Sequence, residues 1–581
     1  MTLRPRFFRV AVLAAALAPA PAWAGLTVRV EGVEGAERQN VEARLSMYAY
    51  AEGDSTDEAQ IRRLHRQAED EIRSALQAFG HYSPVIRASL RGEGDPPDFV
   101  AEYRIDAGPP TRLARVAVSL SGEGSEFPAL KEALARSTLH PGEPLRHADY
   151  ESTKSGLARA AYLNGFLDAK FTQHELRVDA AQATADVLLS LDTGPRYFFG
   201  EVSVEQQGLD PQFVARYVPI QPGDPFEPDK LLQAQFALSD LGYFGSVEVQ
   251  PHREQEHDRR IPVTIGTTPR PPHKYDIGTG YGTDTGARMT LGAEFRQLND
   301  RGHKLRTDLR VSEVKNSVGL DYRIPLGTRA GESLGFATAY TDEKIADGFS
   351  RRYDFAVTLS RTPGKWQRQL YLKHTWEKSY VPETGLDATK LLLPGMTLSR
   401  GEMDDPIHAR LGWAIFLDGH FGSEAVVSDV TFAQGKALLR GVVPFGERVR
   451  LLGRAELGGT LIDEFRTLPA SQRFFAGGDQ SVRGYAYQSL APHDAANKVI
   501  GGKFLTTYSA EAEYRIHGNW GAAVFLDAGN ADDTPWPKLY KGIGTGVRYR
   551  APVGTVQIDL AHPLDGDRKG VRPHLSIRVG L

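Results

Sequence analysis

Apolar and polar residues alternate one by one along many short segments between Lys274 and Leu581. From Leu305 to Val311, for example, every second residue is apolar or threonine, and the residues between them are charged. Successive side chains of a β-strand point to opposite faces, so such segments predict strands with one apolar and one polar face. At ~19 residues for each strand and its turn, residues 271–581 have room for about 16 strands.

Two architectures use strands of this kind. A soluble β-sandwich turns the apolar face inward, whereas a membrane β-barrel turns it outward to the lipid. Here the polar face carries charge in strand after strand, which suits a water-filled lumen better than a packed interior. We therefore predict a transmembrane antiparallel β-barrel over residues 271–581, with a soluble sandwich as the alternative.

The N-terminus has the pattern of an export signal. Arg4, Arg6 and Arg9 precede the apolar run 10–18, which is too short to span a bilayer. The small-x-small pattern that ends at Ala24 then indicates a cleavage site. Residues 1–24 are predicted to be a secretory signal peptide; the alternative is a buried or interfacial helix. The mature chain is expected to lie outside the cytoplasm.

A repeating pattern organises the segment between the signal and the barrel. Helical runs end at Gly80, Gly165 and Gly242, at intervals of about 80 residues. Turns at Pro109 and Pro195, each followed by a strand-like run, recur in step with those glycines. Two markers in step favour three copies of one module, which we place at residues 25–108, 109–194 and 195–270.

Each module has the pattern strand, helix, helix, strand, strand. In the first, apolar residues recur at intervals of three and four from Ile61 to Phe79, which predicts an amphipathic helix. We predict small α+β modules in which helices cover one face of a short sheet. An edge strand of such a sheet can accept an extended peptide, although the modules can also be simple spacers.

The tract from Arg473 to Tyr485 reads R-F-F-A-G-G-D-Q-S-V-R-G-Y and is not strand-like. It resembles the sixth-loop motif of the Omp85 superfamily of outer-membrane assembly proteins. The segments around Glu513, Asp527 and Asp559 resemble strands of the same family. The three modules are similar to its POTRA domains, so the resemblance covers the whole mature chain. Three modules on one barrel are most similar to its translocation and assembly module branch.

Alternation gives the loop tract a predicted role. Glu513 and Asp527 each lie between residues that face outward, so both carboxylates are expected to point into the lumen. A loop folded into the lumen can set Arg483 against them, because its planar guanidinium stays charged and bonds carboxylates bidentately. The alternative is a surface loop with an exposed arginine. The predicted loop residues are Phe475, Gly477, Gly478, Val482, Arg483, Gly484 and Tyr485.

Glycines also mark the two ends of the predicted barrel sheet. They recur on one face of its first strand, and one lies in the last strand. Glycine weakens strand pairing, so the seam between these strands is expected to open most easily. The resemblance implies a lateral gate there; alternatively, the glycines relieve crowding. The predicted seam residues are Ile277, Gly278, Gly280, Gly282, Ile577, Val579 and Gly580.

Signals for catalysis, cofactors and metals are absent or weak in the sequence. It contains no H-E-x-x-H, P-loop or G-x-S-x-G motif, and it has no cysteine. The net charge of −4 argues against a general nucleic-acid binder. We therefore predict a protein that is not an enzyme, with no cofactor and no metal.

The resemblance implies the remaining functional expectations. They are an outer-membrane location with the modules in the periplasm, and insertion of unfolded β-barrel clients such as autotransporters. The implied partners are a TamB-like, inner-membrane-anchored protein and the outer-membrane lipids. The competing hypotheses are a two-partner-secretion-type pore that exports one dedicated protein, and an adhesive or structural barrel.

Overall fold

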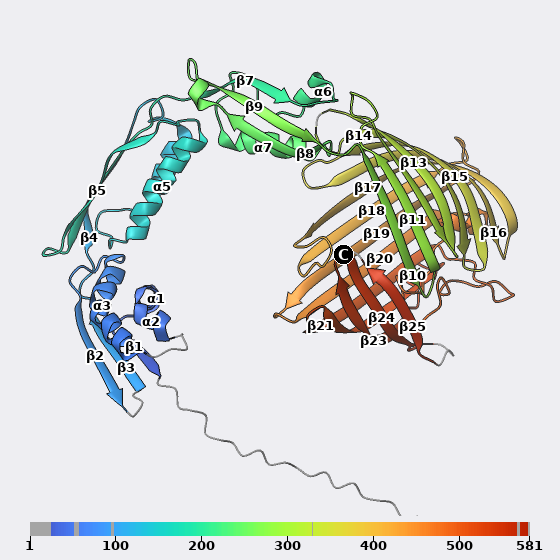
Figure 1. Ribbon diagram of the computed structural model, residues 1–581. Coiled ribbons are helices and arrows are strands. Elements are labelled where there is room, and N and C mark those ends of the chain that lie inside the picture. Colours follow the sequence, from blue (N-terminus) through green and yellow to red (C-terminus); the bar gives the residue numbers. More distant parts are fainter. Residues whose placement is uncertain (1–24, 52–56, 94–97, 328, 566–569, 579–581) are drawn as a thin grey trace, which may run out of the picture. The chain divides into compact units, whose positions relative to one another are not determined.

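The computed structural model describes residues 25–51, 57–93, 98–327, 329–565 and 570–578 of the chain (Figure 1). Within these residues it has three small mixed α/β modules and one antiparallel sheet of sixteen strands. Both parts of the predicted fold class are thereby confirmed. The predicted signal peptide lies outside the described residues. None of the described helices has the length and apolar character needed to cross a membrane.

Module 1 is built on a three-stranded sheet in the order β1-β3-β2. Its long helix carries the predicted apolar stripe from Ile61 to Leu76, which is buried in the module core. Phe79, the last residue of the predicted stripe, lies beyond the helix and is only partly buried. The Asp57 side chain caps this helix by accepting a hydrogen bond from the Ala59 amide at 3.0 Å. Its elements are β1 (Leu26–Glu31), α1 (Gly35–Arg44), α2 (Ser46–Ala51), α3 (Glu58–Gln77), β2 (Val85–Glu93) and β3 (Asp98–Asp106).

Modules 2 and 3 repeat this plan, with sheet orders β4-β6-β5 and β7-β9-β8. In each sheet the last strand of the module in chain order occupies the centre, which leaves two edge strands. Module 2 contains β4 (Arg112–Ser121), α4 (Pro128–Ala135), α5 (His147–Leu163), β5 (Lys170–Asp179) and β6 (Thr184–Asp192). Module 3 contains β7 (Phe198–Glu205), α6 (Pro211–Ala215), α7 (Pro228–Ser239), β8 (Phe244–Pro251), η1 (Arg253–Gln255) and β9 (Arg260–Pro269).

The glycines that mark the repeat follow the main helices in a left-handed conformation. Gly80, Gly165 and Gly242 have φ of +88°, +87° and +77°. At Gly80 the next module also approaches closely, because a Cβ there would lie 2.6 Å from the Leu145 carbonyl oxygen. The first glycine thus serves both the end of α3 and the joint between modules 1 and 2.

Polar contacts also hold modules 1, 2 and the adjoining part of module 3 together. The Tyr82 hydroxyl and His147 Nε2 lie 2.6 Å apart at the first joint. At the second joint, Glu123 accepts a hydrogen bond from the Arg196 amide at 3.1 Å and one from Arg259 Nη1 at 2.6 Å. These two donors lower the pKa of Glu123, so its charge is favoured at neutral pH.

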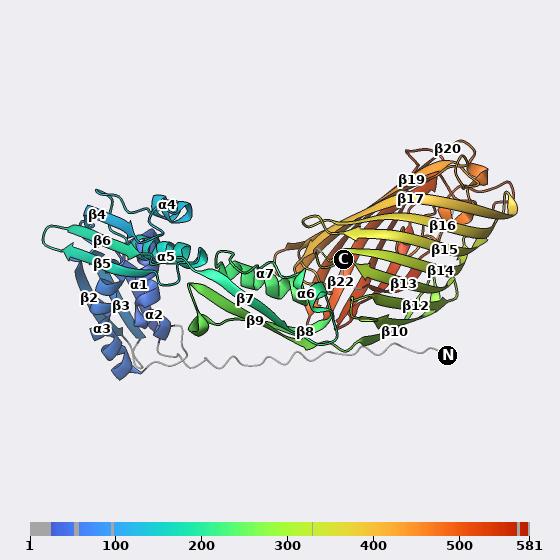
Figure 2. The same cartoon turned by 90° about the horizontal axis from the view of Figure 1, so that it is seen from above.

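The barrel sheet runs in strict chain order from β10 to β25, and every consecutive pair is antiparallel. Figure 2 shows its strands curving side by side around a common interior. The strands are β10 (His273–Gly282), β11 (Gly286–Phe295), β12 (Lys304–Ser312), β13 (Lys315–Pro325), β14 (Ser333–Ile345), β15 (Gly348–Arg361), β16 (Gln367–Val381), β17 (Gly385–Met403), β18 (Gly412–Gly422), β19 (Phe432–Phe445), β20 (Val449–Ile462), β21 (Phe504–His517), β22 (Trp520–Asp532), β23 (Tyr540–Ala551), β24 (Gly554–Pro563) and β25 (Arg572–Arg578).

The outward face of the barrel is apolar. On β15, Tyr353, Phe355 and Val357 are all exposed, the least of them by 44%. Between them, Asp354 turns to the other face and accepts a hydrogen bond at 2.7 Å from Thr375, which is buried. An apolar outer band over a polar interior is the arrangement of a membrane barrel, and it is the reverse of a sandwich.

Residues 202–220 and 230–252 of module 3 pack against the end of the barrel at which β11 and β12 are connected. The Tyr243 hydroxyl donates to the Gly302 carbonyl oxygen, and the Phe213 ring stacks edge-on against Tyr243. Lys304 Nζ donates to the Leu241 carbonyl oxygen at 2.6 Å. The end of α7 and the start of β12 are therefore directly joined.

Replacing Gly80 by alanine tests the joint between modules 1 and 2. The left-handed φ and the nearby Leu145 carbonyl both disfavour a Cβ, so Gly80→Ala should destabilise module 1 by about 1–3 kcal/mol. The measurement is the urea concentration at which module 1 becomes sensitive to protease. Gly156→Ala, in the middle of α5 with no atom near its Cβ, is the control and should be neutral or stabilising. If both variants become protease-sensitive at the same urea concentration, Gly80 does not have this role at the joint.

Candidate functional site

Residues 463–503, between β20 and β21, form a long loop that is tied to the inside of the barrel. Arg473 joins its two halves, because its guanidinium donates to the carbonyl oxygens of Leu468 at 2.8 Å and Ile500 at 3.0 Å. The Ser471 amide donates to Glu377 of β16 at 3.2 Å, and Glu377 is fully buried. We call this segment the lumen loop.

Arg483 of the lumen loop lies at the centre of a cluster of carboxylates. Its Nε and Nη2 donate to the two oxygens of Asp527 at 2.7 and 3.0 Å, which is a bidentate pair. Its Nη1 donates to Glu511 at 2.9 Å and to Asp559 at 2.8 Å. The guanidinium also lies over the Phe525 ring, 3.3 Å from its centroid. One loop residue thus bonds β21, β22 and β24.

A second arginine completes the cluster from the barrel wall. Arg548 of β23 donates to Glu511 at 2.7 Å and also to Asp559, and only 1% of its surface is exposed. Around these residues, four guanidinium groups face four carboxylates among the described residues. They are Arg450, Arg483, Arg548 and Arg550, and Glu511, Glu513, Asp527 and Asp559. Buried charges need such balance, because desolvation of an unpaired ion costs several kcal/mol.

Glycine lets the loop backbone come this close to the wall. A Cβ at Gly542 of β23 would lie 2.0 Å from the Arg483 carbonyl oxygen, so only glycine fits there. On either side of Arg483 the loop is buried: Val482 is fully inaccessible, and Tyr485 is 3% exposed. The Tyr485 hydroxyl donates to the Lys541 carbonyl oxygen at 3.1 Å. The motif is therefore packed inside the wall on both sides of its arginine.

The other predicted loop residues lie in the same packed segment. Gly477, Gly478 and Gly484 all have left-handed φ, between +95° and +103°. Phe475 is partly buried and packs against the cluster of buried apolar loop residues that includes Phe474 and Val482.

The structure gives Glu513 a different partner from the one predicted. Its carboxylate accepts from Arg450 Nε at 2.6 Å, whereas Arg483 bonds Glu511 beside Asp527. Both glutamates face inward, because they are two residues apart on β21. Alternation fixes the face but not the height in the barrel. The pairing of Ser509 with Asp527 brings the Glu511 side of β21 to the level of Arg483.

Sequence reasoning did not assign Glu511, Arg548 or Asp559 to the cluster. The same alternation that turned Glu513 inward also applies to Glu511. Arg548 and Asp559 lie in segments whose family resemblance was visible, but nothing in the sequence set them against Arg483. Their meeting depends on the register of β21 through β24.

The seam between β10 and β25 is the weakest junction in the sheet. β10 pairs with β11 along its whole length, and β25 pairs with β24. Among the described residues no β-ladder joins β10 to β25. Directly after the end of β10, the Thr283 amide donates to the Leu575 carbonyl oxygen at 3.4 Å. Figure 1 shows the two strands side by side at the edge of the barrel.

The predicted seam residues lie on these two strands. On β10, Gly278 and Gly280 lie opposite Thr290 and Arg288 of β11. A Cβ on Gly282 would lie 3.7 Å from the Leu575 carbonyl oxygen. Ile277 is 76% exposed and Ile577 is 36% exposed, so both are on the outer face. Val579 and Gly580 lie outside the described residues.

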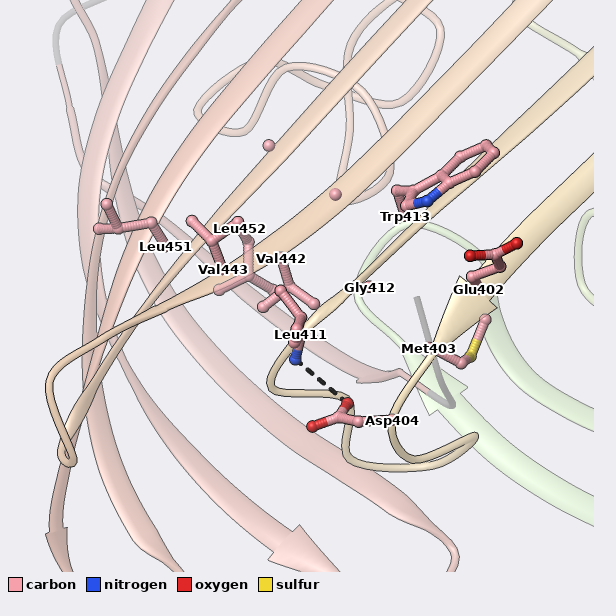
Figure 3. Close-up of a pocket in the computed structure, with 12 residues that line it drawn as sticks. Glu402, Met403, Asp404, Leu411, Gly412, Trp413, Val442, Val443, Leu451 and Leu452 are labelled. Carbon is pink, nitrogen blue, oxygen red and sulfur yellow. Dashed lines mark hydrogen bonds between the residues drawn. The ribbon is translucent and has the colours of Figure 1, made fainter. Parts of the chain in front are cut away.

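A hollow of about 840 Å³ lies elsewhere on the barrel, at the ends of β17 to β20 (Figure 3). Trp413, Val443 and Leu451, which line it, are exposed on the apolar outer face. Its carboxylate Asp404 accepts a hydrogen bond from the Leu411 amide at 3.1 Å and so orders the turn. None of the predicted site residues lines this hollow, which is part of the lipid-facing surface.

Replacing Arg483 by alanine should strongly destabilise the barrel. Three buried carboxylates would lose their shared cation, at a cost of about 3–5 kcal/mol. The measurement is the temperature at which the folded barrel loses its compact gel mobility. Arg466→Ala is the control, because Arg466 is 69% exposed in its pair with Glu383 and should contribute under ~1 kcal/mol. Equal transition temperatures for the two variants would contradict the cluster.

Glutamine substitutions distinguish the two glutamates of β21. Glu511→Gln removes a charge that both Arg483 and Arg548 contact, so the lumen loop should loosen. Glu513→Gln acts mainly on Arg450 and should leave the loop in place. Ion conductance in planar bilayers is the readout, with a several-fold increase expected for Glu511→Gln alone. An increase confined to Glu513→Gln would show that Arg483 uses the other glutamate.

Comparison with known families agrees with this architecture. A model of the Omp85 superfamily domain matches residues 298–581. A model described as POTRA domain TamA domain 1 matches residues 27–107, within module 1. A POTRA model described as surface antigen variable number repeat matches residues 197–269, within module 3. The matched segments follow one another in the order in which the modules and the barrel occur.

Named relatives are distant. The outer membrane protein assembly factor BamA of Nitratidesulfovibrio vulgaris is 24% identical over 420 residues, which are 67% of this chain and 52% of BamA. BamA of Neisseria meningitidis is 24% identical over 226 residues, or 38% of this chain and 27% of that protein. The chain thus spans about half the length, or less, of these two relatives.

A solved structure shares the fold. BamA from Haemophilus ducreyi lacking POTRA domains 1–3 superposes with a TM-score of 0.64 at 16% identity, covering 80% of this chain and 98% of that one. Omp85 assembly factors are not enzymes, as the sequence predicts for this chain. The chain belongs to the Omp85 superfamily, as an outer-membrane barrel whose periplasmic POTRA domains begin with one of TamA type.

Proposed function

We propose that this protein inserts β-barrel proteins into the outer membrane by opening the seam between β10 and β25. The observation that carries the proposal is the contrast between this junction and the rest of the sheet. All consecutive strands form ladders, whereas the seam is joined near Thr283 and Leu575. A strand edge within the hydrocarbon region needs a partner, because its amide and carbonyl groups cannot bond to lipid. An unfolded client strand can supply that partner.

The contacts of the lumen loop support a seam whose two sides differ in rigidity. Arg483 bonds β21, β22 and β24, so the wall on the β25 side of the seam is held as one piece. On the other side, the glycines of β10 leave that strand with few side chains to pack. β10 can then separate from β25 while the ion-pair cluster stays intact.

The periplasmic modules are proposed to receive partners and clients. Each small sheet has edge strands, such as β2 in module 1 and β5 in module 2, that can pair with an extended segment. The TamA-type match of module 1 supports a TamB-like, inner-membrane-anchored protein as the partner. Autotransporters and other β-barrel proteins are the proposed clients, with the outer-membrane lipids as the medium into which they are released.

A reversible crosslink tests whether the seam must open. Because the chain has no cysteine, two introduced cysteines can form only the intended disulfide within it. Tyr281 lies two residues before Thr283, and Ile577 lies two residues after Leu575, so cysteines at both positions should meet across the seam. Oxidation of this pair should slow client insertion into reconstituted membranes at least tenfold, and reductant should restore the rate.

The matched control places the cysteines at Val547 and Ile558, which are already paired in the ladder between β23 and β24. Oxidation of that pair should leave insertion unchanged. If the crosslinked seam inserts clients at the normal rate, lateral opening is not required. A pore that exports a dedicated protein through the lumen would then be the better account.

A further inference from the structure

Three separate segments meet beside the seam, at the end where the lumen loop lies. They are the turn after β10, the lumen loop and β25. Asp479 of the loop bonds His574 Nδ1 of β25, and its amide donates to the Asp284 carboxylate in the turn. The Thr283 hydroxyl donates to Asp479 at 3.3 Å and accepts from the Leu575 amide at 3.3 Å. We call Thr283, Asp284, Asp479, Gly484 and His574 the clasp.

The hydrogen bonds fix the protonation of the imidazole. The Gly484 amide donates to His574 Nε2 at 3.0 Å, and an amide can only donate, so Nε2 must be the acceptor. A neutral imidazole then carries its proton on Nδ1, which donates to Asp479. With 2% of its surface exposed, His574 has both nitrogens committed to the lumen loop.

The same protonation argues against a metal site. Asp284, Asp479 and His574 bring their ligand atoms within 4.8 Å of one another, a set that by residue type resembles a cation site. A metal ligand must offer a lone pair, but Nδ1 carries a proton and Nε2 already accepts the Gly484 amide proton. The arrangement serves contact between segments of the chain rather than coordination.

The clasp is coupled to the ion-pair cluster in two ways. Gly484 directly follows Arg483, so the amide that holds His574 belongs to the motif itself. In the β24–β25 ladder, His574 lies opposite Asp559, which is a partner of both Arg483 and Arg548. The loop segment that carries Arg483 therefore also holds β25, through the Gly484 amide.

We propose that His574 is a positioning residue of the seam, which holds β25 to the lumen loop and, through Asp479, to the turn after β10. The seam then stays closed at this end for as long as the loop is seated, and release of His574 frees the edge of β25 while Arg483 remains in place. The role of seam opening in client insertion rests on the proposed function. The role of the clasp in closing the seam does not.

Spin labels on cysteines at Tyr281 and Ile577 measure the separation of β10 and β25 without any client. In the parent protein in nanodiscs, dipolar broadening should be strong, because facing residues of neighbouring strands are about 5 Å apart at Cα. His574→Phe keeps a ring but neither donates nor accepts, and it should reduce the broadening at least twofold. Asp479→Asn, which keeps an acceptor for Nδ1–H, should behave as the parent. His562→Phe changes an exposed histidine on β24 and is the matched control.

Gel mobility on heating separates a local release from general loosening. The transition temperature of His574→Phe should stay within a few degrees of the parent, because the Arg483 pairs remain. If His574→Phe does not fold, Asp479→Ala, which removes the acceptor for Nδ1–H, carries the same expectation. If a folded His574→Phe or Asp479→Ala variant shows the same dipolar broadening as the parent, the proposal is wrong. So would separation of the labels in the parent on adding EDTA alone, because a bound cation would then hold the clasp.

Client insertion by the same proteins distinguishes this inference from the proposed function. If the seam separates in His574→Phe and the Tyr281–Ile577 crosslink has no effect on insertion, the clasp stands and the gate fails. If the crosslink stops insertion and His574→Phe leaves the broadening unchanged, the gate stands and the clasp fails.

Discussion

The burial of the Arg483 guanidinium inside the barrel is the interaction on which the rest of this structure depends. A charged group removed from water is tolerated only where opposite charge and hydrogen-bond acceptors replace its hydration shell. Here Asp527, Glu511 and Asp559 supply both, from three different strands of the barrel wall. The loop can hold its place only if β21 to β24 are in register, and those strands avoid unpaired carboxylates only if the loop is seated.

Because of this mutual dependence, some strands of the barrel wall are held more firmly than others. Around the loop, buried ion pairs hold the strands of the wall together, and Arg548 of β23 adds bonds to Glu511 and Asp559. β10, at the start of the sheet, has its ladder with β11 and a short contact with β25 near Thr283. In the proposed function, the opening lies at the seam because the ion pairs hold β21 to β24 and the glycines weaken β10. The proposed insertion of clients uses this difference, since β10 can move while β21 to β24, on the other side of the seam, keep their shape.

Much of this fold follows from local patterns in the sequence. Period-two alternation predicts the barrel strands and their inward carboxylates, and the spacing from Ile61 to Phe79 predicts α3. The partners of Arg483 depend on a quantity that the pattern does not contain. Glu511 and Glu513 are equivalent by alternation, and only the pairing of β21 with β22 sets their heights relative to the loop.

The clasp was hidden from sequence analysis for the same reason. His574, Asp479 and Asp284 belong to segments separated by about a hundred residues or more, and the closure of the barrel brings them together. The seam glycines carried a local signal, because glycine has a known effect on pairing. A single histidine among alternating residues carries none until its neighbours across the strands are known.

Hydrogen exchange of the whole protein in lipid nanodiscs tests the central claim most directly. The account predicts slow exchange for the loop amides of Val482 to Tyr485 and for β21 to β24, and fast exchange for β10 and β25. The loop should then be as protected as the strands that hold it. Fast exchange of these loop amides, or equal protection of the seam and the other strands, would contradict an ion-paired loop set against an easily opened seam.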